Sequence, residues 1–281
     1  MKRARHQAAD GAAMDRCKIW CKMLLAALLA CGTALAGCGG SNASAAAGAA
    51  TAPASVAAAQ TTEVGEKVPS DDPVILNFHA LGRVAGEDHL FRSASPLRDL
   101  EVAGADPGDP RTVAAAHERL KHMADLGIRT IVSLENEDPE SGDTGKSAQG
   151  TALTTPWIEL EKREAAAVGV NFVALPMSNS GPHSLQTMSD VQVAAVLDRT
   201  AAKLLSLARE GGVDFHCTAG HDRTGIVTAY IRMKYEHWPV EEAIAEMRRF
   251  GHDWPIFSND GGATSWHEDH LRAIAGMLGT K

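Results

Sequence analysis

The chain has 281 residues, of which 44% are hydrophobic and 22% are charged. These proportions fit a soluble globular protein with one domain or at most two. The formal net charge of -8 argues against a general nucleic-acid binder, for which an excess of basic residues is expected, so no nucleic-acid partner is predicted.

The beginning of the chain has the composition of an export signal. Residues 1–22 carry six basic side chains against two acidic ones, and an uncharged apolar run follows over residues 23–36. This layout is typical of a secretory signal peptide, and the apolar run is too short to span a bilayer comfortably. Met14 is an alternative start to Met1, because the stretch behind it is still a complete signal.

The apolar run ends in the sequence Leu-Ala-Gly-Cys at Cys38, which resembles the lipobox of bacterial lipoproteins. The resemblance implies lipidation of Cys38, so that a lipid anchor alone holds the protein on a membrane. Because Gly39 follows and not an aspartate, the usual sorting pattern implies export to the periplasmic or outer-membrane face, or to the cell surface where there is no outer membrane. The alternatives are an ordinary signal peptide, an uncleaved anchor, or lipidation at Cys31.

Three segments follow from this composition. They are a signal peptide over residues 1–37, a flexible tether rich in Ala, Ser and Gly over 38–72, and a folded domain over 73–281. Four of the five cysteines lie in the signal or at its end, and only Cys217 belongs to the folded domain. An exported protein with a single cysteine cannot form an internal disulfide, so this thiol is either incidental or present for its reactivity.

Short β-type runs alternate with helical patterns along the folded domain. This alternation is typical of an α/β domain, and it predicts a mixed, mainly parallel sheet flanked by helices. The predicted strands lie at residues 74–78, 89–92, 129–134, 170–175 and 213–216.

Capping residues and glycines mark the helix boundaries. A first helix ends before Gly127, and a second has Pro156 in its first turn and ends at Gly169. The longest helix begins with a capping box formed by Ser189 and Gln192. Further helices are predicted towards the C-terminus, over residues 224–236, 239–250 and 265–278.

Residues 216–225 read His-Cys-Thr-Ala-Gly-His-Asp-Arg-Thr-Gly, and we call them the cysteine loop. They follow a β-type run and open a helix, which aims backbone N–H groups and the positive end of the helix dipole at one small bowl. Gly220 lets the backbone close tightly, and Gly225 leaves room for close packing. The residues predicted to bind a phosphate group in this bowl are Thr218, Ala219, Gly220, His221 and Gly225.

Four side chains of the cysteine loop are predicted to carry its chemistry. The helix dipole, the N–H groups and Arg223 favour the thiolate of Cys217, so its pKa is expected below the usual value of about 8.5. Cys217 is then a nucleophile at neutral pH, and Arg223 offers a planar fork of donors to two phosphoryl oxygens. Thr224 can donate its hydroxyl to the sulfur, and His216 orients the loop from behind.

The pattern Cys-x5-Arg-Thr, preceded by His216 and followed by Gly225, resembles the signature loop of the cysteine-based protein tyrosine phosphatases. The ending Asp-Arg-Thr-Gly is most similar to bacterial dual-specificity and lipid-like members. The resemblance covers most of residues 74–251, because further landmarks of the family follow in order. These landmarks lie at residues 91–96, 126–134, 169–177 and 241–251.

The resemblance implies a phosphoester hydrolase that works in two steps. Cys217 attacks phosphorus while Arg223 and backbone amides hold the oxygens, and water then hydrolyses the phosphocysteine. No cofactor and no metal are implied, and the substrate is a phosphorylated protein or a phosphorylated inositol or lipid. His221 stands where lipid-like members often carry lysine, which weakens the implied preference for phosphoinositides.

Departure of the alcohol or phenol requires a proton donor near the leaving oxygen. Many relatives carry an aspartate on the loop that follows the strand at residues 170–175, but here no carboxylate occurs before Asp190. Asp222 is the first candidate acid, as in some lipid-like members, and His183 is the second. The alternatives are that Asp222 only orients Arg223 or the loop backbone, and that His183 is an exposed loop histidine.

Three further interpretations concern residues around this loop. Arg92 either braces the cysteine loop or forms a purely structural salt bridge. A second set of residues is numerous enough to raise a metal site, namely His252, Asp253, His267, Asp269 and His270. His267 and His270 fall on one helix face, but no third ligand of assured proximity can be named, so no metal site is predicted. A catalytically idle phosphate-binding module would keep the bowl and lose the nucleophile or the arginine, whereas Cys217 and Arg223 are both present.

Overall fold

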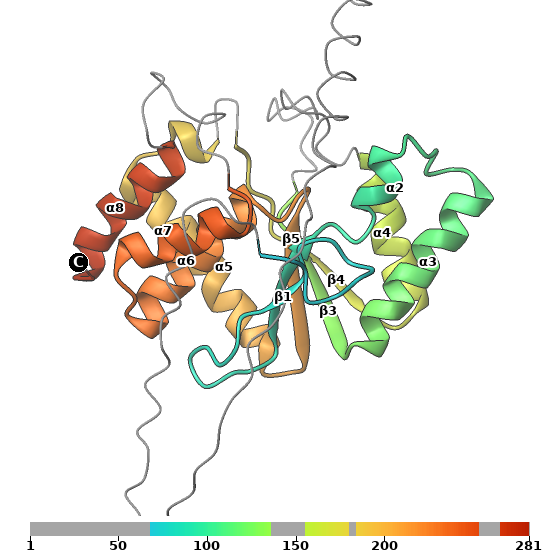
Figure 1. The fold of residues 1–281 in the computed structure, drawn as a ribbon, viewed down its shortest axis with the longest axis horizontal. Coiled ribbons are helices and arrows are strands. Elements are labelled where there is room, and N and C mark those ends of the chain that lie inside the picture. Colours follow the sequence, from blue (N-terminus) through green and yellow to red (C-terminus); the bar gives the residue numbers. More distant parts are fainter. Residues whose placement is uncertain (1–67, 136–154, 180–183, 253–264, 281) are drawn as a thin grey trace, which may run out of the picture. The chain divides into compact units, whose positions relative to one another are not determined.

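The computed structural model describes residues 68–135, 155–179, 184–252 and 265–280. Within them a five-stranded sheet with the order β1-β2-β5-β3-β4 lies between two layers of helices (Figure 1). β1 runs antiparallel to β2, and all other neighbours are parallel, so the predicted mixed, mainly parallel α/β fold is confirmed. The strands are β1 (His79–Ala80), β2 (Leu90–Ala94), β3 (Ile128–Ser133), β4 (Asn171–Ala174) and β5 (Gly212–Cys217).

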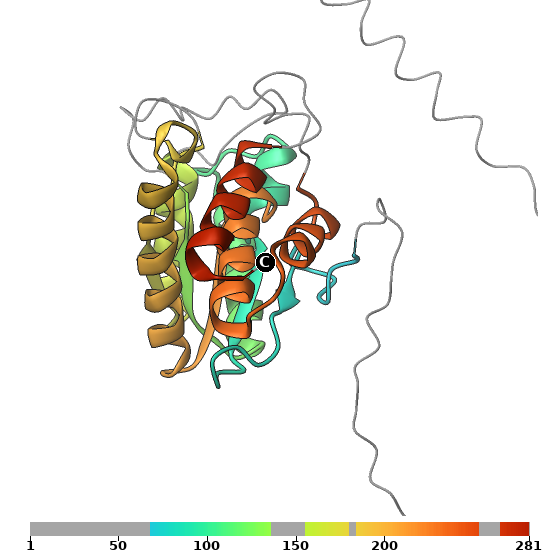
Figure 2. The same cartoon turned by 90° about the vertical axis from the view of Figure 1, so that its left-hand side faces the viewer.

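The helices divide between the two faces of the sheet. One face carries α2 (Arg98–Val102), α3 (Pro110–Asp125) and α4 (Thr155–Ala167), as Figure 1 shows. The other face carries four helices, which Figure 2 views from the front. They are α5 (Asp190–Ala208), α6 (Asp222–Glu236), α7 (Val240–Arg249) and α8 (Trp266–Leu278), and a short 3-10 turn at Leu185–Thr187 precedes them.

Two apolar cores lie on the two faces of the sheet. The larger core, on the side of α5 to α8, contains Leu204, Phe215 and Ile226. The other core contains Leu120 and Ile158 from α3 and α4. Full burial of each such side chain contributes about 1.5–3 kcal/mol. β5 is buried along its whole length as a result, so the loop at its end stands on a rigid support.

The predicted capping residues do begin the helices. The Ser189 backbone N–H donates to Gln192 Oε1 at 2.9 Å at the start of α5. Ser265 Oγ accepts from the Glu268 backbone N–H at 3.3 Å at the start of α8. Such caps satisfy N–H groups that have no partner inside the helix, and each is worth about 1 kcal/mol.

The strand predicted at residues 74–78 is wrong. The backbone there runs through bends, because polar side chains take the hydrogen bonds that a sheet neighbour would need. Asp72 Oδ1 accepts from the backbone N–H groups of Val74 and Ile75, each at 2.8 Å, and Ser70 Oγ donates to Ile75 O at 2.7 Å. Asn77 follows with a φ of 53°, which a strand does not allow. Helix α2 was not predicted either.

Residues 68–78 pack against the domain, and we call them the N-terminal strap. The Val68 N–H donates to Arg249 O at 3.1 Å. Asp72 is buried, and its Oδ2 lies 2.9 Å from His122 Nε2. The sequence analysis placed residues 68–72 in the tether, whereas these contacts make them part of the folded domain. The predicted signal peptide and Cys38 lie outside the described residues, within which no helix has the length and hydropathy needed to cross a bilayer.

Candidate active site

The cysteine loop joins the C-terminal end of β5 to the first turn of α6, as predicted. Cys217 is the last residue of β5 and pairs in register with Ala94 of β2. Gly220 turns the backbone with a φ of 69°, and a Cβ added there would lie 2.4 Å from Ser93 O. Only glycine fits this position, since a side chain would collide with the neighbouring strand. The loop is thus held tightly against β2.

Cys217 is a free cysteine and lies nearly covered at the base of this loop. Its side chain is 3% exposed and belongs to the larger apolar core. The buried Arg92 guanidinium is close enough for the charge of a Cys217 thiolate to act on it. The sulfur therefore stands at the border between an apolar core and a buried cation, rather than in apolar surroundings alone.

Arg223 is folded back across the cysteine loop and fixed by four acceptors. Its Nη2 donates to Thr218 Oγ1 at 3.0 Å and to Glu135 Oε2 at 3.4 Å. Its Nη1 donates to the carbonyls of Met177 at 3.2 Å and Leu134 at 3.4 Å. These acceptors come from the loop itself and from the chain that follows β3 and β4. The guanidinium is therefore held in one orientation before any ligand arrives.

Glu135 is a residue of this site that was not predicted from the sequence. It is buried, it receives a hydrogen bond from Thr218 Oγ1 at 2.9 Å, and it pairs with Arg223. Burial raises the pKa of Glu135, and the charge of Arg223 acts in the opposite direction. Its position just beyond the C-terminal end of β3 was the available signal, because the ends of neighbouring parallel strands meet at one edge of a sheet.

Arg92 braces the outer wall of the cysteine loop. Its Nη2 donates to Gly220 O, and its guanidinium lies 4.5 Å from the centre of the Phe250 ring. Burial lowers the pKa of Arg92 to about 10, although the charge of Glu246 opposes this change. Within the described residues Arg92 forms no ion pair, so the interpretation as a structural salt bridge is wrong.

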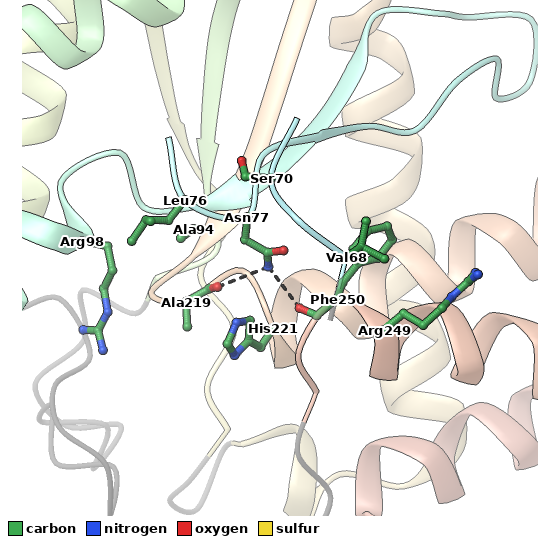
Figure 3. A pocket seen from close by; sticks show the side chains of 10 residues that line it. All are labelled: Val68, Ser70, Leu76, Asn77, Ala94, Arg98, Ala219, His221, Arg249 and Phe250. Atoms are coloured by element: carbon green, nitrogen blue, oxygen red, sulfur yellow. Dashed lines mark hydrogen bonds between the residues drawn. The ribbon is translucent and has the colours of Figure 1, made fainter. Parts of the chain in front are cut away.

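Asn77 of the N-terminal strap holds the same wall from outside, and the sequence analysis missed it too. Its side-chain amide donates to Gly220 O at 2.9 Å. It also donates to Phe250 O at 3.1 Å and to Ala219 O at 3.4 Å, and Figure 3 shows these two bonds. Its Oδ1 lies 3.2 Å from His79 Nε2. Because these bonds occupy carbonyls of the loop, they fix the loop backbone in place.

A pocket of about 430 Å³ lies along this outer wall. Ala219 and His221 of the cysteine loop line it, together with basic side chains from two other elements (Figure 3). Among the described residues that line the pocket none is acidic, although the chain as a whole carries a net charge of -8. Its lining residues are Val68, Ser70, Leu76, Asn77, Ala94, Arg98, Ala219, His221, Arg249 and Phe250.

Asp222 begins α6 and is bound by a histidine from a distant segment. His252 Nδ1 lies 2.6 Å from Asp222 Oδ1, and His252 Nε2 lies 2.8 Å from Ser265 Oγ. The His252 side chain is fully buried, whereas the Asp222 side chain is 23% exposed. His183, the other candidate acid, lies outside the described residues.

Comparison with known proteins adds to this geometry. The model of the Tyrosine phosphatase family matches residues 111–236, which include the cysteine loop. The Dual specificity protein phosphatase TpbA of Pseudomonas aeruginosa (strain UCBPP-PA14) is 34% identical over 186 residues, which cover 63% of this chain and 69% of TpbA. The chain belongs to the tyrosine phosphatase family. It is a cysteine-dependent phosphatase.

Solved structures of phosphatases are also among the proteins to which this chain is similar. The crystal structure of P. aeruginosa TpbA has 19% sequence identity and a TM-score of 0.43, and the match covers 77% of this chain and 97% of TpbA. A crystal structure of kinase associated phosphatase has 14% identity and a TM-score of 0.47, with 75% and 99% of the two chains covered.

Two further predicted residues, Thr224 and Gly225, lie in the first turn of α6. Gly225 allows close packing of α6 on α7, since a Cβ there would lie 2.7 Å from Met247 Cγ. Thr224 is buried and its hydroxyl makes no hydrogen bond to any described residue, so the expected bond to the Cys217 sulfur is not formed in this structure. The role of Thr224 as a donor to the sulfur stays a prediction.

Two of the residues weighed as metal ligands, both on α8, have other partners in the phosphatase, and Asp253 lies outside the described residues. The His267 ring stacks on Trp266 with ring centres 3.5 Å apart. His270 Nδ1 lies 2.6 Å from Asp190 Oδ1. Across the described ranges no group of three or more His, Cys, Asp or Glu side chains is arranged to hold a metal ion.

The inner side of the cysteine loop rests on a buried ion pair. His216 Nε2 lies 2.8 Å from Glu161 Oε1, and neither side chain is exposed. Burial alone lowers the pKa of a histidine, but the charge of Glu161 outweighs it and raises the pKa of His216 to about 9. His216 is therefore a buried imidazolium directly before Cys217. This place fits its predicted role in orienting the loop, and that role stays a prediction.

We expect the free energy of unfolding of the phosphatase to fall as the pH rises from about 7 to about 9. The pKa of His216 is raised in the folded state, so its pairing stabilises the fold fully below an ordinary pKa of about 6.5 and is lost as the pH passes about 9. Burial also raises the pKa of Asp214, to about 7. The destabilisation that comes from ionising this buried carboxyl group develops as the pH rises towards 7, below the pH range in which His216 acts.

Urea unfolding at the two ends of this pH range measures the effect, which should be on the order of 1–3 kcal/mol. His216→Asn should flatten the profile, and the same change at the exposed His89 should leave it as it is. A slope that survives in His216→Asn contradicts the assignment to this ion pair.

Proposed function

We propose that this phosphatase hydrolyses phosphoesters through a phosphocysteine intermediate, with Cys217 as nucleophile and Arg223 as phosphate ligand. One observation carries the proposal. Cys217 and Arg223 lie on one short loop at the N-terminus of α6, and Glu135 and Thr218 hold the guanidinium rigidly against that loop. A helix N-terminus with a fixed guanidinium is suited to an anionic group with several oxygens.

The first chemical step transfers the phosphoryl group to sulfur. The Cys217 thiolate attacks phosphorus, the S–P bond forms and the bond from phosphorus to the ester oxygen breaks. Arg223 and the backbone N–H groups of Thr218, Ala219, Gly220 and His221 hold the three other oxygens as the group flattens. The leaving oxygen takes a proton from an acid, for which Asp222 is the candidate.

The second step returns the enzyme to its starting state. A water molecule attacks phosphorus, the S–P bond breaks and inorganic phosphate is released with the Cys217 thiolate restored. The acid of the first step takes the proton from this water. The hydroxyl of Thr224, which has no partner among the described residues, is available to bind the departing sulfur.

We propose phosphorylated proteins as the substrates, with phosphoinositides and inositol phosphates as the alternative class. The name of the relative TpbA, a dual specificity protein phosphatase, supports the first class. The pocket beside the cysteine loop, with Arg98, His221 and Arg249 in its lining, supports a substrate with a second negative group near the scissile phosphate.

Trapping the intermediate tests the mechanism. The protein is mixed with a phosphotyrosine peptide, a phosphothreonine peptide or an inositol polyphosphate, quenched in acid and digested for mass spectrometry. We expect one phosphoryl group on the peptide that contains Cys217, with the phosphopeptides as better donors, and none in Cys217→Ala. Turnover without this adduct, or an adduct that persists in Cys217→Ala, refutes the proposal.

For the N-terminal part of the chain we propose export, cleavage of residues 1–37 and lipidation of Cys38, with the phosphatase domain on the periplasmic or outer-membrane face. The support is the basic, then apolar, composition of residues 1–36 and the lipobox-like sequence that ends at Cys38.

A further inference from the structure

We propose that His252 is a positioning residue that holds Asp222 as the proton donor of the first chemical step. The inference rests on the proposed phosphocysteine mechanism, and it adds the partner that makes Asp222 suitable for the task. His252 follows α7 and lies thirty positions along the chain from Asp222, so no motif of the cysteine loop contains it.

The hydrogen bonds of His252 with Ser265 and Asp222 favour one tautomer of its ring. Ser265 Oγ already accepts from the Glu268 N–H at 3.3 Å, so its own hydroxyl hydrogen is available for His252 Nε2 at 2.8 Å. Nε2 is then the acceptor of the ring, and Nδ1 carries the hydrogen. The Nδ1–H group donates to Asp222 Oδ1 over 2.6 Å. Ser265, His252 and Asp222 thus form a chain of hydrogen bonds that ends at the cysteine loop.

The two oxygens of Asp222 have different surroundings. Oδ1 is bound by His252, whereas Oδ2 makes no hydrogen bond to any described residue. The side chain is 23% exposed, and Asp222 directly precedes Arg223 at the start of α6. Oδ2 is therefore the oxygen that can carry a proton and meet a substrate, while the bond at Oδ1 stops the carboxyl group from rotating away.

Asp222, held by His252, can donate the proton that the first step needs and accept the proton that the second step releases. In the first step the proton on Asp222 Oδ2 moves to the ester oxygen as its bond to phosphorus breaks. The carboxylate that remains keeps the hydrogen bond from His252 Nδ1. In the second step the attacking water gives a proton to Oδ2 as the S–P bond breaks, so Asp222 is again ready to donate.

The surroundings of His252 keep its ring in place. The side chain is fully buried, and the ring of His267 meets it edge-on with centres 5.1 Å apart. Glu268 Oε1 lies 4.0 Å from His252 Nε2, and the same carboxylate is bound by Arg248 at 2.7 Å and 2.8 Å. A buried ring in this position cannot easily change its orientation, which is what positioning requires.

Two substrates with different leaving groups test the role. Phenol is a much weaker acid than p-nitrophenol, so hydrolysis of phenyl phosphate depends far more on a proton donor than hydrolysis of p-nitrophenyl phosphate does. Asp222→Asn should lose about 10²- to 10⁴-fold in kcat on phenyl phosphate and much less on p-nitrophenyl phosphate. His252→Ala should show the same selective loss, of about 10-fold or more.

Conservative variants separate positioning from folding. The side-chain amide of His252→Asn can replace Nδ1 as the donor to Asp222, so this variant should recover most of the loss. His252→Gln places its amide nearer to Ser265 and should behave like His252→Ala. The matched control is His270→Ala, which breaks a second His–Asp pair of the same 2.6 Å length, between His270 and Asp190, and should leave the ratio of the two rates unchanged.

An equal loss on both substrates in His252→Ala, or no recovery in His252→Asn, reduces His252 to a structural link and overturns the inference. An unchanged ratio in Asp222→Asn also overturns it, because the acid is then another group. Cys217→Ser is measured alongside: if it retains turnover, the proposed mechanism itself has failed. If it is inactive while the ratios stay constant, only the role of His252 is refuted.

Discussion

Replacing Cys217 by serine is expected to lower kcat on p-nitrophenyl phosphate by about 10⁴-fold or more. A serine hydroxyl is a far weaker acid than a thiol, so the helix N-terminus and the buried cations around this position cannot maintain it as an anion. The change replaces one sulfur atom of the core by a smaller oxygen atom, so the fold should persist. Thermal unfolding by circular dichroism checks this point on the same sample.

The result separates a catalytic role of Cys217 from a packing role. A packing role is the alternative because Cys217 is nearly covered and belongs to the apolar core. If the thiol were only a packing residue, Cys217→Ser would cost some stability and leave kcat of the remaining folded protein unchanged. Retained turnover at full folding would therefore remove Cys217 from the mechanism, whatever the sequence of the loop.

Arg223→Lys is expected to lower kcat on the same substrate by about 10²- to 10³-fold, although the charge is kept. The guanidinium has its orientation set by Glu135 and Thr218 on one side and by two backbone carbonyls on the other. An ammonium group has no planar fork, so it cannot satisfy these acceptors and bind two phosphoryl oxygens together. The loss should fall mainly on kcat, since the two donors matter most in the transition state.

A matched control exists in the buried pair of Arg232 and Glu246, whose closest contact is 2.9 Å and which lies between α6 and α7. Arg232→Lys disturbs a buried arginine–carboxylate pair of the same kind, so it should reduce stability without the loss in kcat. Glu135→Gln should give an intermediate loss in kcat. The variant keeps the Arg223 side chain but removes the carboxylate charge that holds its guanidinium in one orientation. An Arg223→Lys enzyme with unchanged kcat would contradict the proposed binding of the phosphoryl oxygens.

The parts of this structure that could be predicted from the sequence are those with local causes. The capping box at Ser189 is formed by residues only three positions apart, so its pattern survives in any fold. The cysteine loop is likewise contiguous, and its geometry follows from a strand, a glycine turn and a helix start. The mistaken strand at residues 74–78 has a local cause as well: its apolar run favoured a strand, but Ser70 and Asp72 compete for the backbone hydrogen bonds.

The residues that sequence reasoning missed come to the site from far along the chain. Glu135 reaches Arg223 because β3 is the neighbour of β5 in the sheet, although 88 positions separate the two residues. Asn77 reaches Gly220 across 143 positions, and His252 reaches Asp222 only because the chain after α7 returns to the start of α6. Such contacts depend on strand order and helix packing, which hydrophobic periodicity does not determine.

The N-terminal strap links the leading end of the domain to the site through a series of attachments. A pulling force on the chain ahead of Val68 would act first on the bond from Val68 to Arg249 O. It would next act on the buried Asp72, which is bound to His122, and on the Leu76 carbonyl, which accepts from the Ala94 N–H of β2 at 2.9 Å. Only after these attachments would it act on the amide of Asn77, which donates to the carbonyls of Gly220 and Phe250. The wall of the phosphate bowl is therefore shielded from tension at the leading end of the domain by α3 and the sheet.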